Sequence, residues 1–303
     1  MHRQIGPFQT SAIGLGCMNL SHAYGTPPPK KEAVILLNNA LDMGYSMLDT
    51  AALYGFGENE ALIGEAVMHR RHDFVLASKC GMTKNDQGIR EINGRPEAIK
   101  KTCEDSLRRL KTEVIDLYYL HRWDKSVPIE ESVGAMADLR REGKIRTLGL
   151  SEVSSVNLKK ANAEHPIAAV QSEYSLWTRN PEISVLNDCK KMGITFVAFS
   201  PLGRGFLTDN VPHPDSFEEK DIRKGMPRFQ SENYAHNVRV AEAFDRLAKV
   251  NDMPRAQLAL AWLLGQGEHI VPIPGTTQLN HLKENFSAMD MTLPASIVDE
   301  LNG

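Results

Sequence analysis

Four polar residues have side chains that suit proton transfer to a carbonyl group: Asp49, Tyr54, Lys79 and His121. A free tyrosine has a pKa of about 10, so it donates a proton poorly at neutral pH. A neighbouring lysine ammonium favours the phenolate and lowers that pKa. We expect Asp49 to keep Lys79 charged and oriented. We expect His121 to hydrogen-bond a substrate carbonyl or to share the proton with Tyr54, an arrangement typical of general acid catalysis.

The positions of these residues relative to apolar segments support one shared site. Asp49, Lys79 and His121 each end a short apolar segment, and Tyr54 follows Asp49 by five residues. Catalytic groups of a β/α barrel lie at the C-terminal strand ends and in the loops that follow. Any one of these residues alone is more often structural, whereas the ordered set on three successive strands predicts a catalytic site.

Eight short apolar segments alternate with amphipathic ones along the chain. The segments are almost continuously apolar, as in strands that are buried on both faces. Eight parallel strands with intervening helices favour a (β/α)8 TIM barrel of the α/β class over an open doubly wound sheet. The expected strands are Ile13–Cys17, Tyr45–Asp49, Phe74–Lys79, Ile115–His121, Arg146–Ser151, Ala168–Ser172, Thr195–Ser200 and Ile270–Ile273.

The amphipathic segments predict helices over Lys31–Met43, Pro96–Leu110 and Ser132–Glu142. Before the first strand, Met1–Thr10 is expected to form a hairpin over the N-terminal end of the barrel. After the seventh strand, the long polar segment Leu207–Asn237 predicts a cofactor or substrate flap, since loops of this length are usually functional. No linker or second core interrupts residues 1–303, which predicts a single barrel domain.

Composition excludes several classes of function. The 303 residues are 42% hydrophobic and 24% charged, with a net charge of −3, so neither a nucleic acid nor a membrane surface is an expected partner. The chain shows no signal segment and no membrane span. The four cysteines form no C-x-x-C pair, so we expect no metal site and a reduced, cytoplasmic protein.

Several segments in a fixed order resemble the motifs of one known family. Gly44–Tyr54 with Gly57-Glu58-Asn59-Glu60 contains Asp49 and Tyr54, and Asp116–Arg122 contains His121. With four later segments they resemble the aldo-keto reductases over almost the whole chain, most of all the bacterial and plant branch. Several ordered motifs are far more specific than one Gly-rich match. The later segments are Gly149-Leu150-Ser151-Glu152, Gln171–Trp177, Phe199–Gly205 and Ile273–Asn285.

The resemblance implies a (β/α)8 barrel and stereospecific hydride transfer to a small carbonyl substrate, usually from NADPH. It implies that Tyr54 donates the proton, that Lys79 and Asp49 tune the acidity of Tyr54, and that His121 orients the substrate. A G-x-G-x-x-G dinucleotide fingerprint is absent, because Gly14-Leu15-Gly16 is too short and no acidic residue follows at the expected distance, which disfavours a Rossmann fold.

The resemblance also implies how the cofactor is held. Ser151 and Gln171 would hydrogen-bond the nicotinamide carboxamide, and Phe199 would stack on the ring. The loop from Ser200 to Gly205 would hold the pyrophosphate. Residues near a helix that starts at about Leu279 would surround the adenosine, where a helix N-terminus favours an anion. The loop residues are Ser200, Leu202 and Arg204, and the adenosine residues are Gly275, Thr276, Gln278, His281, Glu284 and Asn285.

The chain departs from the family where NADPH carries its 2′-phosphate. Related proteins often place Lys and Arg after Gly275-Thr276, whereas this chain has Thr277 and Gln278, and His281 stands where others have Arg. Guanidinium and ammonium groups hold phosphate best. The resemblance therefore implies NADP(H), and the departure predicts a weakened preference for it and possible use of NAD(H).

The sequence leaves more than one possibility open for the substrate contacts and for the function. Tyr24 and Trp123 are the expected substrate contacts, with Met18, Met82 and Trp177 as further rim candidates. The expected function is reduction of small aldehydes or ketones. A second interpretation is a non-enzymatic module that binds a nicotinamide cofactor and senses redox state. A third is a lyase in which Lys79 forms a Schiff base.

Overall fold

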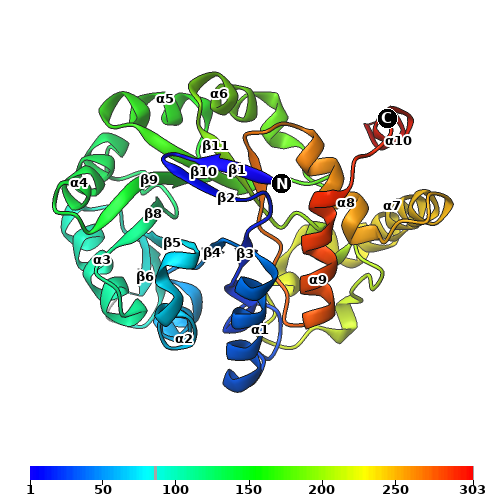
Figure 1. Ribbon diagram of the computed structural model, residues 1–303, viewed down its shortest axis with the longest axis horizontal. Coiled ribbons are helices and arrows are strands. Elements are labelled where there is room, and N and C mark those ends of the chain that lie inside the picture. The colour runs from blue at the N-terminus through cyan, green and yellow to red at the C-terminus, as the bar shows by residue number, and fades with distance from the viewer. Residues whose placement is uncertain (85–86, 303) are drawn as a thin grey trace.

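A closed barrel of parallel strands forms the centre of the molecule. The computed structural model describes residues 1–84 and 87–302. Within these residues eight strands pair in parallel in the order β12-β11-β10-β9-β8-β5-β4-β3 (Figure 1). Backbone amides of Gly14 and Gly16 donate to the carbonyls of Pro272 (3.0 Å) and Pro274 (3.2 Å). These bonds join the two outermost strands, so the sheet closes and the expected (β/α)8 barrel is confirmed.

All eight expected strands are present, and their ends differ from the expected ends by at most two residues. The agreement follows from their buried, continuously apolar sequences. The strands of the barrel are β3 (Leu15–Gly16), β4 (Met47–Asp49), β5 (Val75–Cys80), β8 (Ile115–Leu120), β9 (Ile145–Ser151), β10 (Ile167–Glu173), β11 (Thr195–Phe199) and β12 (Ile270–Pro272).

Helices surround the barrel on its outside (Figure 1). The helix expected over Pro96–Leu110 has these ends, whereas the one expected from Ser132 begins at Ile129, because Pro128 stands at its N-cap. No helix in the described part of the chain is long and apolar enough to cross a bilayer. The helices are α1 (Lys30–Met43), α2 (Glu58–Ala66), α3 (Pro96–Leu110), α4 (Ile129–Arg141), α5 (Ser155–Glu164), α6 (Val185–Met192), α7 (Ser231–Val250), α8 (Arg255–Gly265), α9 (Leu279–Ser287) and α10 (Ala295–Asn302).

Apolar side chains fill the barrel and the layer around it. One buried cluster lies inside the barrel and includes Met47, Leu117, Val197 and Val271. A larger cluster packs the outer face of the strands against the helices. Neighbouring residues of several strands, such as Met47 and Leu48, belong to different clusters, because successive side chains point to opposite faces. This packing holds the strand ends, and with them the polar residues, in fixed positions.

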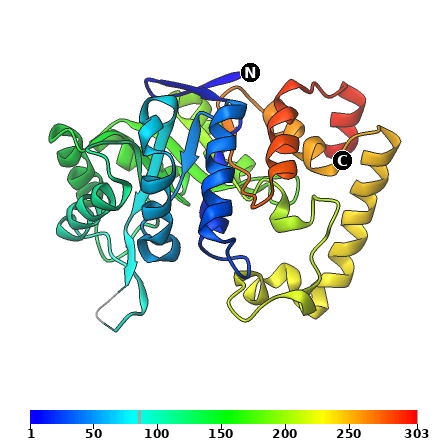
Figure 2. The same cartoon turned by 60° about the horizontal axis from the view of Figure 1, so that its bottom comes forward.

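The N-terminal residues close one end of the barrel, as expected. Strands β1 (His2–Ile5) and β2 (Phe8–Ser11) form an antiparallel hairpin. Ile5 is fully buried in the inner cluster, and the Thr195 hydroxyl donates to the Gln4 carbonyl at 2.6 Å. In Figure 2 this hairpin lies at the top, opposite the long segments that extend from the C-terminal strand ends.

The segment after β11 is more ordered than the sequence suggests. We expected a loop over Leu207–Asn237, but α7 already begins at Ser231, and three short 3-10 helices precede it. Phe206 stacks on Phe229 (ring centroids 5.0 Å apart), and Phe217 meets Phe229 edge-on at 5.0 Å. These aromatic contacts give the segment a small core of its own. The 3-10 helices are η6 (Pro214–Ser216), η7 (Ile222–Gly225) and η8 (Pro227–Phe229); residues 207–230 are called the flap below.

Gly16 has a structural role where the barrel closes. A Cβ at this position would lie 2.7 Å from the Ile273 carbonyl oxygen. Only glycine therefore allows β3 to approach the backbone that follows β12. The glycines of Gly14-Leu15-Gly16 serve this closure, in agreement with the absence of a dinucleotide fingerprint in the sequence.

Candidate active site

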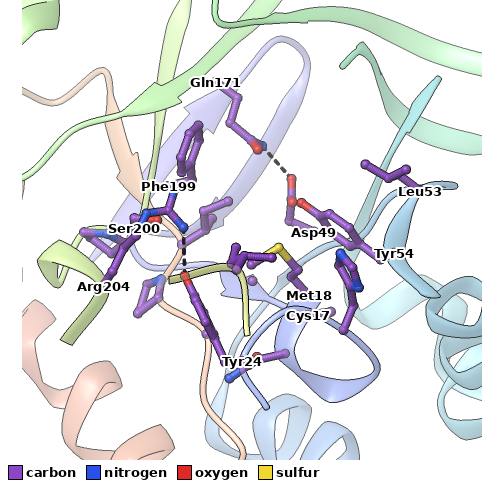
Figure 3. A pocket seen from close by; sticks show the side chains of 18 of the residues that line it. Cys17, Met18, Tyr24, Asp49, Leu53, Tyr54, Gln171, Phe199, Ser200 and Arg204 are labelled. Atoms are coloured by element: carbon purple, nitrogen blue, oxygen red, sulfur yellow. Dashed lines mark hydrogen bonds between the residues drawn. The ribbon is translucent and has the colours of Figure 1, made fainter. Parts of the chain in front are cut away.

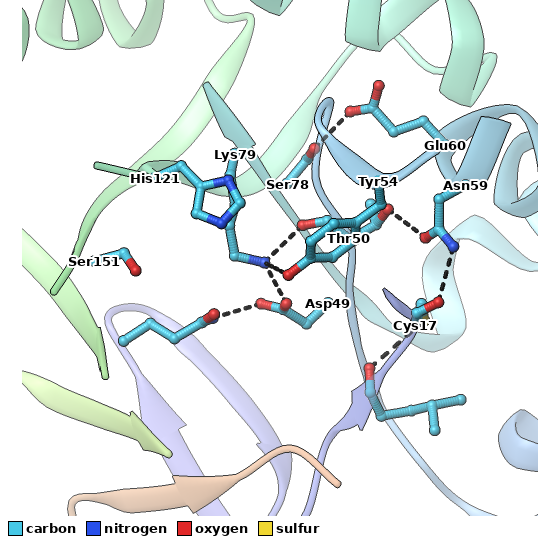
Figure 4. Close-up of polar contacts among 12 residues, drawn as sticks. Cys17, Asp49, Thr50, Tyr54, Asn59, Glu60, Ser78, Lys79, His121 and Ser151 are labelled. Atoms are coloured by element: carbon cyan, nitrogen blue, oxygen red, sulfur yellow. Dashed lines mark hydrogen bonds and ion pairs between the residues drawn. The ribbon is translucent and has the colours of Figure 1, made fainter. Parts of the chain in front are cut away.

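The four residues expected to act in proton transfer lie together at the C-terminal end of the barrel (Figure 4). Asp49 ends β4, Lys79 lies near the end of β5, and His121 directly follows β8. Tyr54 begins the short helix η2 (Tyr54–Gly57) after β4. Parallel strands end at the same edge of a barrel, so residues far apart in sequence meet here.

The Lys79 ammonium is fully engaged by its neighbours. It forms an ion pair with Asp49 Oδ1 and donates to the Thr50 carbonyl at 2.8 Å. It also donates to the Tyr54 hydroxyl at 3.3 Å. The other Asp49 oxygen accepts a bond of 2.7 Å from the Gln171 amide. Asp49 thus fixes the lysine, and the lysine reaches the phenol.

Burial and charge set the protonation of this group. Burial raises the pKa of Tyr54, although the nearby Lys79 charge acts in the opposite direction. Burial acts to lower the pKa of Lys79, but Asp49 and Tyr54 together outweigh burial, and the net pKa is raised. Burial, with the charges of Lys79 and Arg122, lowers the pKa of His121 well below 6.5. At neutral pH the site therefore holds a phenol, an ammonium and a neutral imidazole.

This result corrects one expectation. The sequence suggested that Lys79 lowers the pKa of Tyr54, and the lysine does contribute in that direction. The net direction is nevertheless upward, because the tyrosine is only 8% exposed and desolvation disfavours the phenolate. The phenol consequently keeps the proton that reduction of a carbonyl requires.

Two buried polar chains fix the strand ends that hold the group (Figure 4). The Thr50 hydroxyl donates to Asn59 Oδ1 at 2.6 Å, and the Asn59 amide donates to the Cys17 carbonyl at 2.8 Å. The Ser78 hydroxyl donates to Glu60 at 2.6 Å, and Arg109 neutralises that carboxylate. Helix α2 is thereby tied to β3, β4 and β5. The sequence placed Asn59 and Glu60 in a motif but gave them no role.

A pocket of about 500 Å³ opens beside Tyr54 (Figure 3). Its wall includes Ser151, Gln171 and Phe199, the expected nicotinamide contacts, which lie on β9, β10 and β11. The Ser151 hydroxyl accepts a bond of 3.0 Å from Arg122 and retains its own proton. Gln171 uses its amide N–H on Asp49 and retains its carbonyl oxygen. Both can still bond a carboxamide.

The loop after β11 forms the next part of the wall. Ser200, Leu202 and Arg204 all line the pocket, and Ser200 and Arg204 have positive φ angles of 49° and 60°. Such conformations are costly for non-glycine residues and occur most often at functional sites. Arg204 donates to the Tyr24 hydroxyl at 2.9 Å and pairs with Glu173 at 3.1 Å (Figure 3). Tyr24, expected at the substrate, thus lies against the expected pyrophosphate residue.

A second hollow of about 300 Å³ lies near the start of α9. It shares five lining residues with the first pocket, namely Leu202, Gly205, Thr208, Arg223 and Gly275. The six residues expected at the adenosine all line it, and α9 begins at Leu279 as expected. These six residues are Gly275, Thr276, Gln278, His281, Glu284 and Asn285.

The flap lies over both hollows. Thr208, Ile222, Arg223 and Met226 line the first pocket, and the second includes Asp209, Asn210 and Pro212. The Ile222 amide donates to the Ala23 carbonyl at 3.0 Å, which joins the flap to the loop after β3. The segment therefore lies where the sequence analysis expected a flap.

Some expected rim residues lie elsewhere. Trp123 does not line either hollow, and its indole donates to the Val127 carbonyl at 2.9 Å. Trp177 stacks on Phe206 with centroids 4.5 Å apart. Tyr24, Met18 and Met82 do line the first pocket. Four basic side chains that line the first pocket had no role in the sequence analysis, namely His22, Arg90, Arg122 and Arg223.

Only one of these four had a visible signal in the sequence. Arg122 directly follows His121, so its position beside the expected imidazole could have been inferred. His22, Arg90 and Arg223 come from loops or hairpins whose paths are set by tertiary contacts.

The fold and the site together define a barrel oxidoreductase with a buried tyrosine, lysine, aspartate and histidine. Comparison with known proteins agrees: residues 12–303 match the profile described as the aldo/keto reductase family. The chain belongs to this family and is an aldo-keto reductase enzyme.

Similar proteins resemble the chain over nearly its full length. An aldo-keto reductase of Schizosaccharomyces pombe, whose name specifies NADP(+), is 42% identical over 99% of this chain and 89% of its own. The glycerol dehydrogenase of Gluconobacter oxydans has a TM-score of 0.89 at 27% identity, covering 99% of this chain and 94% of that one. An aldo-keto reductase of Klebsiella pneumoniae in complex with NADPH has a TM-score of 0.75 at 26% identity, covering 100% and 95%.

Proposed function

We propose that the chain reduces aldehydes and ketones reversibly with a nicotinamide cofactor, and that Tyr54 is the general acid. The observation that carries the proposal is the contact of 3.3 Å between the buried Lys79 ammonium and the Tyr54 hydroxyl at the pocket wall. The Schizosaccharomyces pombe relative is named for NADP(+), and the Klebsiella pneumoniae structure contains NADPH. Both support a nicotinamide cofactor here.

The two adjoining hollows fit such a cofactor in size and in donor set. A carboxamide needs the hydroxyl and amide groups that Ser151 and Gln171 offer, and Phe199 gives an apolar surface for a ring. Arg204 lines the first hollow and Arg223 lines both, and guanidinium N–H groups suit a pyrophosphate. The bound cofactor supplies the hydride to the carbonyl carbon.

The residues of the chain handle the proton. The neutral His121 imidazole would hydrogen-bond the carbonyl oxygen and hold it near Tyr54; the two rings are 5.9 Å apart and edge-on. The Tyr54 phenol would then give its proton to that oxygen. Lys79 stabilises the phenolate that remains, and Asp49 keeps Lys79 charged. Acid catalysis of this kind contributes about 10²–10⁴-fold in rate.

The geometry argues against Schiff-base chemistry at Lys79. Its ammonium already contacts Asp49, Thr50 and Tyr54, and the residue is only 1% exposed. A Schiff-base lysine must be neutral and accessible, whereas the net pKa of Lys79 is raised. Borohydride with a carbonyl substrate should therefore leave the lysine unmodified.

We also propose that the preference for NADPH over NADH is weak. The second hollow contains the acids Asp209 and Glu284, while its cations are Arg223 and, when protonated, His281. Thr277 and Gln278 offer hydrogen bonds but no charge to a 2′-phosphate. If removing the 2′-phosphate costs orders of magnitude in affinity, this part of the proposal is wrong.

Titration with NADPH and NADH tests the function directly. Quenching of tryptophan fluorescence would report each dissociation constant, and loss of nicotinamide absorbance after adding an aryl aldehyde would report turnover. We expect binding of a cofactor and aldehyde-dependent oxidation. Binding without turnover on a broad aldehyde panel would favour a redox-sensing module, and binding of neither cofactor would reject both.

Replacing Tyr54 with Phe tests the general acid. The substitution removes the hydroxyl and keeps the ring, so we expect cofactor affinity to persist while aldehyde reduction falls by about 10³-fold or more. Stopped-flow absorbance with and without aldehyde separates the two readouts. Turnover close to that of the parent chain would reject Tyr54 as the proton donor.

A further inference from the structure

The guanidinium of Arg122 lines the pocket and forms no ion pair with a described acidic residue. It follows His121 and uses Nη1 to donate to the His121 carbonyl at 2.6 Å and to the Ser151 hydroxyl at 3.0 Å. Both acceptors are neutral. Among the described residues, no carboxylate lies within the ion-pair distance of 4.0 Å. The structure shows no described residue bonded to the remaining N–H groups of Arg122, so they can meet a bound molecule.

Two other arginines of the pocket pair with carboxylates. Arg204 pairs with Glu173 at 3.1 Å, and Arg223 pairs with Asp221 at 2.7 Å. Glu152 contributes a distant attraction to Arg122, but its carboxylate caps the Glu173 amide at 3.0 Å. Arg122 therefore places a positive charge next to His121 at the pocket surface, and no described carboxylate forms an ion pair with it.

A second positive charge reinforces it. Arg90 lies on β7 (Arg90–Ile92), in the hairpin that projects beyond the barrel at the foot of Figure 2, and it lines the same pocket. No described carboxylate pairs with it. Burial lowers the pKa of Arg122, and the positive charge of Arg90 acts in the same direction. Partly desolvated charges without a partner are costly, so this corner of the pocket favours an anion.

We propose that Arg122, supported by Arg90, selects carbonyl substrates that carry a carboxylate. The inference rests on the proposed reductase function and adds a substrate class to it. Guanidinium binds carboxylate through two parallel N–H bonds. The carboxylate itself is unchanged: the carbonyl carbon gains the hydride, its oxygen gains the Tyr54 proton, and the product is a hydroxy acid.

The test compares 4-formylbenzoate with its methyl ester, which has the same aldehyde and no charge. In the parent chain we expect kcat/KM to be at least about tenfold higher for the acid, as a charge-assisted hydrogen bond predicts. Arg122→Met should bring the ratio close to one, chiefly through KM for the acid, and Arg122→Lys should restore part of it. Arg239→Met, on the exposed surface of α7, should leave the ratio unchanged.

The outcomes separate this inference from the proposed function. Equal reduction of acid and ester by the parent chain overturns the inference and leaves the function standing. A loss of NADPH affinity in Arg122→Met, with an unchanged ratio, assigns Arg122 to the cofactor and also overturns it. No reduction of either aldehyde with bound cofactor rejects the function. Tighter binding of benzoate than of benzamide, followed by fluorescence, would still support the anion site.

Discussion

The ion pair of Asp49 and Lys79 links stability to catalysis at the scale of single residues. Both side chains are almost fully buried, with exposures of 2% and 0%. In Lys79→Met the Asp49 charge would remain buried without a partner, so the free energy of unfolding should fall by about 3–5 kcal/mol. Urea unfolding measures this change, and aldehyde reduction should be lost as well.

A double variant separates the two effects. Asp49→Asn with Lys79→Met removes both charges, so much of the lost stability should return while reduction stays impaired. Recovery of activity together with stability would mean that Lys79 acts only by supporting the fold, and not on Tyr54.

His121 predicts a pH dependence of stability. Its folded-state pKa lies well below 6.5 because of burial and of the charges on Lys79 and Arg122. Below about pH 6.5 the unfolded chain takes up a proton here that the folded chain does not, so stability present above this pH is lost as the pH falls. The loss is at most about 1.4 kcal/mol per pH unit.

The variant His121→Gln measures this contribution. It should lose less unfolding free energy than the parent chain between about pH 7 and about pH 5. The lowered pKa values of His22 and His269 are common to both proteins and cancel in the comparison. Equal losses in the two proteins would show that His121 titrates normally in the folded state.

At the scale of elements, Glu173 holds the flap against the barrel. Its carboxylate accepts from Arg228 in η8 at 2.6 Å and from Arg204 at 3.1 Å. Glu173→Gln removes the charge from both bonds, each worth about 1.5–3 kcal/mol. We expect faster proteolysis within residues 207–230 and a weakening of NADPH binding by about tenfold or more.

The control for this variant is Glu219→Gln, since Glu219 is an exposed flap residue that forms no ion pair with any described residue. It should change neither proteolysis nor cofactor affinity. If Glu173→Gln also leaves both unchanged, the flap is held by its aromatic core rather than by the carboxylate.

The strands of the barrel and the helices around it were the most predictable part of the fold. Each strand is a continuous apolar segment because both its faces are buried, and Pro96 marks the first turn of α3. The start of α4 was placed three residues late, because Ile129, Glu130 and Glu131 follow Pro128 without a Ser or Thr N-cap signal. The flap was expected to be a loop because its sequence is polar. It forms short 3-10 helices, which are stabilised by contacts between aromatic residues that lie far apart in the sequence.

Some residues of the site were likewise predictable from the sequence, and others were not. Residues at strand ends, such as Asp49 and Gln171, were predictable because the barrel brings strand ends together. Arg90 and Arg223 were not, because the paths of a hairpin and a flap place them at the pocket. The net direction of the Tyr54 pKa shift was also missed, since the degree of burial is a property of the folded packing.

At the scale of the whole molecule, stability and chemistry lie at opposite ends of the barrel. The N-terminal hairpin closes one end through Ile5, and the pocket opens at the C-terminal strand ends (Figure 2). The inner cluster connects the two ends. A change at the hairpin can therefore weaken the fold while the strand ends keep their geometry.

Replacing Ile5 with Ala tests this separation. Ile5 is fully buried against Met47, Leu117 and Val197, so the cavity should cost about 2–5 kcal/mol in urea unfolding. Aldehyde reduction at 25 °C should keep its kcat/KM, because Ile5 lies in the N-terminal hairpin and lines neither hollow. Ile183→Ala, at a residue that is 84% exposed, should change stability by no more than about 0.5 kcal/mol. A matched fall of kcat/KM and stability in the Ile5 variant would show that the barrel transmits strain from one end to the other.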